Sequence, residues 1–354
     1  IPNHDTIIRF KYNISGWSDF VNEQPWTQSN ESGSYDPKYD RIFLLRAHYK
    51  TIDCNETRRI WIYLPPDYYQ HDDLINKKRY PVVYMHHGEM MFNYHNVESE
   101  WKIDTLLNEA YFNLSSCSAL RWGFIVVAIE SLKDPDKADQ EYIVSREESG
   151  CHSINNLKTF TGSFRRHIDT TFRTIGQWDY TAHYGVKTSG SMVLHAFTKY
   201  YRIIGKFACF SNILNNKNGE SDNELLEDMV KSPIFDTPKS SVNKSSKNTS
   251  TSISNLLSGQ FPKLYMLWSI NDTIQTIDLV RYMTRKKFPT TNLQLLPIND
   301  TYQPSMYGNQ MIKSLCWFYD THDPSNFSQV AEWFHFDKSN KHLLSNLSNY
   351  QHGR

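Results

Sequence analysis

The ten residues HYGVKTSGSM, 183–192, follow a strand-like run and precede a helical pattern. A sharp turn between a strand and a helix presents its central side chain to a ligand, provided that the residues two before and two after the centre are small. Gly185 and Ser189 meet that requirement and place Lys187 at the centre. We therefore expect a strained turn that presents an amine.

A second register would centre the turn on Ser189, with Lys187 and Ser191 as its flanks. The lysine side chain is too large for a flanking position, which argues against Ser189 as a nucleophile. Lys187 could itself be a nucleophile if burial lowered its pKa, but no motif nearby supplies a base or a cofactor. A lysine that projects into a pocket, or that pairs with a carboxylate, is the simpler interpretation.

Two adjacent histidines, His86 and His87, precede Gly88 and Glu89. Neighbouring side chains of a strand point to opposite faces, so both histidines can ligate one metal ion only if the strand is broken. We therefore predict no metal site and no cofactor here. His87, Gly88 and Glu89 are expected to form a turn at the end of a strand.

Alternating elements supply the scaffold that these residues need. Seven short apolar runs predict strands at 58–64, 80–86, 124–130, 180–186, 206–211, 263–269 and 293–298, and helical patterns occur at 101–114, 157–172, 189–204, 276–288 and 309–321. Buried strands that alternate with helices indicate a mainly parallel sheet covered by helices on both faces. The predicted fold class is α/β.

The domain organisation follows from composition. We predict an N-terminal extension at 1–45, a single α/β domain at 46–321 and a C-terminal extension at 322–354, which Trp333 and Phe334 could dock. Within the domain, the Ser-, Asn- and Lys-rich residues 237–254 have too few apolar side chains to repay the entropy of ordering. They are expected to form a disordered surface insertion.

Six segments, in order, resemble the esterase branch of the α/β-hydrolase fold, which includes enterochelin esterases, esterase D and feruloyl esterases. They are RRIWIYLPPDY, KKRYPVVYMHHGEMMF, EWKIDTLLNEA, FIVVAIES, EYIVSRE and FRRHIDTTFRT, and the likeness covers residues 42–320. The resemblance implies a nucleophilic serine at the turn after 180–186, with later loops that carry an acid and a histidine. It also implies that His87, Gly88 and Glu89 are the remnant of an oxyanion turn.

Under this resemblance the catalytic positions are degenerate. Lys187 stands where the serine would be, and Asp272 could stand at the acid position. The loop that would carry the histidine, 295–310, has none, and its counterpart is Thr301 or Tyr302. A hydroxyl does not accept a proton near neutral pH as imidazole does. We therefore expect an esterase-like chain without a catalytic triad.

Several features favour a secreted glycoprotein. The chain begins Ile-Pro, as after removal of a signal peptide, and ten Asn-x-Ser/Thr sequons occur at Asn13, Asn30, Asn55, Asn113, Asn243, Asn248, Asn271, Asn299, Asn326 and Asn346. Chance would give about half as many in such a chain. The 38 basic residues equal the 38 acidic ones, and no apolar run approaches the ~20 residues that span a bilayer. We expect a soluble chain that binds no nucleic acid and does not insert into membranes.

The five cysteines are an odd number, so an oxidising compartment would leave at least one without a partner in the chain. Cys209 and Cys316 lie in apolar runs and are predicted to be core thiols. Cys117 and Cys151 lie in polar segments and are the predicted disulfide pair.

The sequence thus predicts a secreted, N-glycosylated pseudoenzyme that works by binding or assembly, with itself or another secreted protein as the partner. One alternative is an active hydrolase whose nucleophile is displaced to Ser163 or Ser191 and whose base is His87, His152 or His183. Another is a lectin-like module that binds a glycan or small molecule in the old substrate cleft, with some of the 22 Tyr, 19 Phe and 9 Trp as stacking surfaces.

Overall fold

The computed structural model describes residues 42–51, 54–68, 78–92, 101–132, 134, 137–138, 141–142, 157, 160–210, 231–232, 234, 261–269, 273–286, 288–298 and 304–319. The predicted insertion at 237–254 and the predicted C-terminal extension lie outside the described residues, as does the N-terminal extension up to residue 41. Among the described helices, none is long and apolar enough to cross a membrane.

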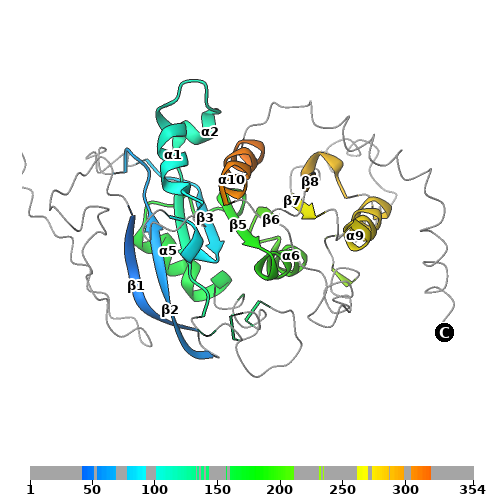
Figure 1. Ribbon diagram of the computed structural model, residues 1–354, viewed down its shortest axis with the longest axis horizontal. Helices are drawn as coiled ribbons and strands as arrows, with labels where there is room; N and C mark the ends of the chain where they lie inside the picture. The colour runs from blue at the N-terminus through cyan, green and yellow to red at the C-terminus, as the bar shows by residue number, and fades with distance from the viewer. Residues whose placement is uncertain are drawn as a thin grey trace, which may run out of the picture.

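An eight-stranded sheet forms the centre of the fold, in the order β1-β2-β4-β3-β5-β6-β7-β8 (Figure 1). Its strands are β1 Ile42–Thr51, β2 Cys54–Tyr63, β3 Val82–His86, β4 Ile125–Ile129, β5 Thr181–Val186, β6 Lys206–Phe210, β7 Lys263–Ser269 and β8 Leu293–Ile298. β2 pairs antiparallel with β1 and β4, and every other pair is parallel. Strands β3, β4, β5 and β6 are buried along their whole length because helices cover both faces.

One face of the sheet packs against α1 Ile103–Phe112, α2 Ser118–Trp122 and α10 Pro304–Tyr319. The other face packs against a π-helical turn, Phe160–Phe164, and α5 Arg165–Thr171 near β3 and β4, and against α6 Thr188–Tyr200 and α9 Thr273–Arg285 near β6 and β7. Successive residues of each strand alternate between these cores, as the period of a strand requires. Short 3₁₀ turns occur at Gly88–Met90, Trp178–Tyr180 and Thr290–Asn292.

The predicted α/β class with a mainly parallel sheet is confirmed. All seven predicted strands are present, and the five predicted helices correspond to α1, the π-helical turn with α5, α6, α9 and α10. Strand β1 was not predicted, and the boundary expected after residue 45 falls inside it. The short helix α2 was also missed.

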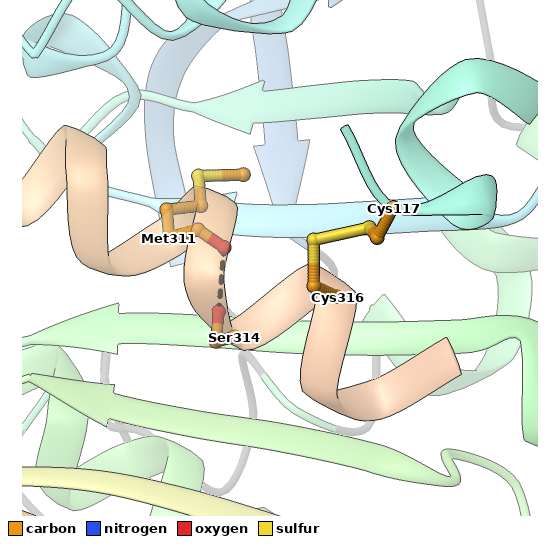
Figure 2. The surroundings of a disulfide bond; sticks show 4 residues. All are labelled: Cys117, Met311, Ser314 and Cys316. Carbon is orange, nitrogen blue, oxygen red and sulfur yellow. Dashed lines mark hydrogen bonds between the residues drawn. A yellow bond between two sulfur atoms is a disulfide. The ribbon is translucent and has the colours of Figure 1, made fainter. Parts of the chain in front are cut away.

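A disulfide joins Cys117, at the start of α2, to Cys316 in α10, with 5.9 Å between the Cα atoms (Figure 2). The predicted pairing of Cys117 with Cys151 is therefore wrong, and so is the prediction that Cys316 is a core thiol. The reason is topological, because α2 and α10 lie over the same face of the sheet although they are far apart in sequence. Cys209 is a buried thiol, as predicted.

Candidate active site

The turn between β5 and α6 has the strained geometry expected for it. Lys187 has φ 52° and ψ −122°, a conformation that is costly for a residue with a side chain. A Cβ atom on Gly185 would lie 2.8 Å from Gly190 N and would overlap the Ser189 carbonyl. The small residue at position 185 is thus a steric necessity, and Lys187 stands at the centre of the turn as predicted.

The Ser189 hydroxyl holds this turn together. It accepts a hydrogen bond from Val186 N at 2.8 Å and donates one to Val186 O at 2.9 Å. Ser189 is fully buried, so its hydroxyl serves the backbone rather than a substrate. Behind it, Met192, Val193 and Phe197 of α6 pack in the core, as predicted.

A second turn follows β3, beside the first. His87 has φ 58° and ψ 47°, and a Cβ atom on Gly88 would lie 2.5 Å from Ile129 N. Because β3 and β5 are parallel neighbours, the turn at His87 and the turn at Lys187 lie at the same edge of the sheet. In open α/β sheets this edge, at the carboxyl ends of the strands, is where ligands bind.

The structure brings a serine, a histidine and a carboxylate together at this edge. The Ser131 hydroxyl lies 2.7 Å from His87 Nδ1 and 2.9 Å from Glu89 Oε1. Ser131 N donates to Glu89 Oε2 at 3.0 Å, and His87 Nδ1 lies 3.2 Å from Glu89 Oε1. Sequence reasoning missed Ser131, although it directly follows the predicted strand 124–130 and therefore stands at the edge where a site is expected.

The proton positions in this cluster follow from Glu89. Burial acts to raise the pKa of Glu89, but hydrogen bonds from His87 and from Ser131 N–H outweigh it and hold that pKa below its usual value. An ionised carboxylate only accepts hydrogen bonds, so the Ser131 hydroxyl donates to Glu89 and His87 carries its proton on Nδ1.

This arrangement differs from that of a catalytic triad. In a triad the serine donates to Nε2 of the histidine, and the acid accepts from Nδ1. Here the hydroxyl of Ser131 and the carboxylate of Glu89 share the same nitrogen of His87. The proton of Ser131 is therefore directed to Glu89, which is too weak a base to activate the hydroxyl near neutral pH.

His183, a candidate base, lies in the interior. Its Nε2 atom is 2.6 Å from Nε2 of His86, and both rings are buried. Burial lowers the pKa of His183 to about 3 and that of His86 well below its usual value, so both rings are neutral. The His86 ring also packs against Tyr142 and Phe160, inside the core. His183 therefore does not serve as a base at the edge of the sheet.

The remaining candidates fall in different places. Ser191 is buried in α6, and Ser163 is exposed in the π-helical turn. His152, Asp272, Thr301 and Tyr302 lie outside the described residues. The described part of the chain holds no group of three side chains that could ligate a metal ion.

Buried charges lie behind the cluster. Arg58 and Glu141 form an ion pair of 2.9 Å in which neither side chain is exposed. Burial raises the pKa of Glu141, and the charge of Arg58 opposes that shift. Its neighbour Tyr142 places its hydroxyl 3.4 Å from Ser131 Oγ. The cluster at the edge of the sheet is thus supported by a rigid polar interior.

Comparison with known proteins bears on the fold. No family model matches the chain, and no curated protein matches it by sequence. Among solved structures, the siderophore hydrolase EstB from Aspergillus nidulans has a TM-score of 0.54 and 14% identity over 82% of this chain and 98% of that chain. An IroE-like serine hydrolase from Shewanella oneidensis has a TM-score of 0.51 and 14% identity over 78% of this chain and 79% of that chain. A ferulic acid esterase has a TM-score of 0.51 and 11% identity over 78% of this chain and 97% of that chain.

The chain has the α/β-hydrolase fold. It is the fold of esterases and related hydrolases, as the ordered sequence segments implied, although identities this low say nothing of the reaction. In an α/β-hydrolase the turn between β5 and α6 is the nucleophile elbow. Lys187 stands at the centre of the corresponding turn here.

Proposed function

We propose that this α/β-hydrolase is a secreted, N-glycosylated pseudoenzyme that works by binding or by assembly. The observation that carries the proposal is Lys187 at the centre of a well-formed nucleophile elbow. A lysine amine is a weak nucleophile toward esters unless its pKa is strongly lowered, and it does not replace a serine alkoxide. The direction of the Ser131 proton toward Glu89 supports the same conclusion.

Two further features support secretion. The disulfide between Cys117 and Cys316 is of a kind that persists in oxidising compartments and is rare in the cytosol. The ten sequons are acceptor sites for the glycosylation of secreted proteins. The proposed partner is a second copy of the chain or another secreted protein, with the N-terminal extension or the segment around Trp333 and Phe334 as the contact.

The test is chemical. Purified full-length protein is exposed to a fluorophosphonate probe and to short-chain aryl esters. We expect neither labelling nor turnover, and we expect Lys187→Ser alone to restore neither, because a new serine would still lack a base. Stoichiometric labelling of any serine would overturn the pseudoenzyme proposal.

A second candidate, an active hydrolase with a displaced nucleophile, is favoured by the contact of Ser131 Oγ with His87 Nδ1. It requires the proton of Ser131 to move to His87 rather than to Glu89. Under this candidate Ser131→Ala abolishes probe labelling, whereas Ser191→Ala, a matched change in α6, preserves it. Labelling that depends on Ser131 would establish this candidate in place of the first.

A further inference from the structure

The hairpin of α1 and α2 carries three exposed apolar side chains. Phe112, Leu114 and Trp122 are 59%, 84% and 50% exposed. The hairpin projects from the rest of the molecule beside α10 (Figure 1). Single exposed apolar side chains are common in soluble proteins. Three of them on one short hairpin suggest that another group normally shields them from water.

The two ends of the hairpin converge on one cation. Lys78 Nζ lies 4.7 Å from the centre of the Trp122 ring and 5.9 Å from that of Tyr111. The Trp122 indole donates to Arg79 O at 3.0 Å, which fixes the ring with half of its surface exposed. The Trp122 ring is therefore held in place on the surface.

Asn113 lies between Phe112 and Leu114 in the sequence and is held by three hydrogen bonds. Its N–H donates to Glu109 O at 3.1 Å, and its carbonyl accepts from Ser116 N at 3.0 Å. Its side-chain Oδ1 accepts from Ser115 N at 2.9 Å. Asn113 is exposed, and none of these bonds uses Nδ2, the atom to which an N-linked sugar is attached.

We infer that Asn113 is glycosylated and that the first sugars of its glycan cover Phe112, Leu114 and Trp122. Nδ2 forms a bond to the anomeric carbon of an N-acetylglucosamine donor that is linked through a diphosphate to a lipid. The diphosphate leaves with the bonding electron pair, and Nδ2 loses one proton. The apolar C–H face of a pyranose then packs on the exposed rings. Because the glycan is covalently attached next to these rings, it does not have to bind from solution.

The sequon is the reason to choose the glycan over other occupants. The sequon Asn113-Leu114-Ser115 places the attachment atom between two exposed apolar residues, Phe112 and Leu114, so a glycan there would lie over them. A second copy of the chain, bound through the same apolar residues, is the competing occupant. The inference rests on the proposed secretion and goes further by assigning one site and its structural role.

The first experiment locates the sugar. The full chain is secreted from a eukaryotic cell line and treated with a peptide glycosidase in heavy-oxygen water, and its peptides are read by mass spectrometry. We expect Asn113 to become a heavy-oxygen-labelled aspartate. If other sequons are labelled and Asn113 is not, this inference fails while the proposed glycoprotein stands. If no sequon is labelled, the proposed secretion and glycosylation fail with it.

The second experiment tests the cover. Asn113→Gln and Ser115→Ala each destroy the sequon, and Asn346→Gln removes a different one as the control. We expect the first two variants to bind more of an apolar fluorescent dye and to shift from monomer to dimer mass in light scattering. Leu114→Ser added to Asn113→Gln should reverse the shift, because it removes the most exposed apolar side chain. If both sequon variants match wild type in dye binding and mass, or if glycosylated wild type is already a dimer that Leu114→Ser dissociates, the cover is not the glycan.

Discussion

Replacing Cys117 and Cys316 together by serine removes a crosslink between residues 199 positions apart. A crosslink of that span restricts the unfolded chain, and the loop-entropy relation gives an upper value of about 5 kcal/mol at 25 °C. The disulfide also joins α2 to α10, and both helices pack on one hydrophobic core at the same face of the sheet. Within α10, the Ser314 hydroxyl donates to Met311 O at 2.7 Å (Figure 2). We expect the free energy of unfolding to fall by about 3–5 kcal/mol.

The assay is urea unfolding followed by circular dichroism. With a slope of about 3 kcal/mol/M, the midpoint of the double serine variant should fall by about 1–1.7 M. Wild type in a reducing agent should fall at least as far, because it loses the same crosslink. Ser163→Ala, a change at an exposed serine of the π-helical turn, is the control, and its midpoint should stay at the wild-type value.

Two results would refute this reasoning. A double serine variant with the wild-type midpoint would mean that the crosslink does not form or does not restrict the unfolded chain. A Ser163→Ala control that falls as far as the double variant would mean that the shift does not report the loss of the crosslink.

Three further perturbations test other parts of the fold. Gly185→Ala forces a methyl group into the first turn of α6 and should lower the free energy of unfolding by about 3 kcal/mol, whereas Gly162→Ala, where no atom lies within 4 Å of the added carbon, should leave the urea midpoint unchanged. Burial lowers the pKa of Lys263 from 10.5 to about 8, so the folded chain releases this proton before the unfolded chain does. Lys263 should therefore contribute stability that grows from pH 8 to 10.5, measured as a widening difference in the free energy of unfolding between wild type and Lys263→Met over that range. Arg58→Met leaves the buried carboxylate of Glu141 without its cation and should cost about 3–5 kcal/mol in thermal unfolding, and adding Glu141→Leu should recover most of the loss.

The interior strands were predictable from sequence, and the edge strand β1 was not. Short runs of consecutive apolar residues between helical patterns have one common interpretation, a strand buried on both faces. Among the described strands β1 pairs with β2 alone, and its sequence IFLLRAHYKT mixes charged and apolar residues. Edge strands tolerate charged side chains, so the run resembles a polar extension when it is read alone.

The contacts of Ser131 and of Cys117 depend on which elements are neighbours. β3 and β4 pair in parallel with His86 opposite Ile129, so the residues after each strand, His87 and Ser131 among them, lie side by side. The pattern of polar and apolar residues along the chain does not reveal which strands are neighbours in the sheet. The same limit explains the cysteine error, because local polarity favoured a nearby partner while the fold supplied a distant one.

The turn at Lys187 shows what a strained backbone geometry does and does not imply. The close approach of Gly185 to the Ser189 carbonyl and the two hydrogen bonds between Ser189 and Val186 fix the turn without using the central side chain. A lysine at positive φ costs about 1–3 kcal/mol, and the buried contacts of α6 offset that cost. The backbone strain at Lys187 is therefore a consequence of the sharp connection between β5 and α6. Whether the turn catalyses a reaction depends on the side chains around it, and Ser131, the serine beside His87, donates its hydrogen bond to Glu89.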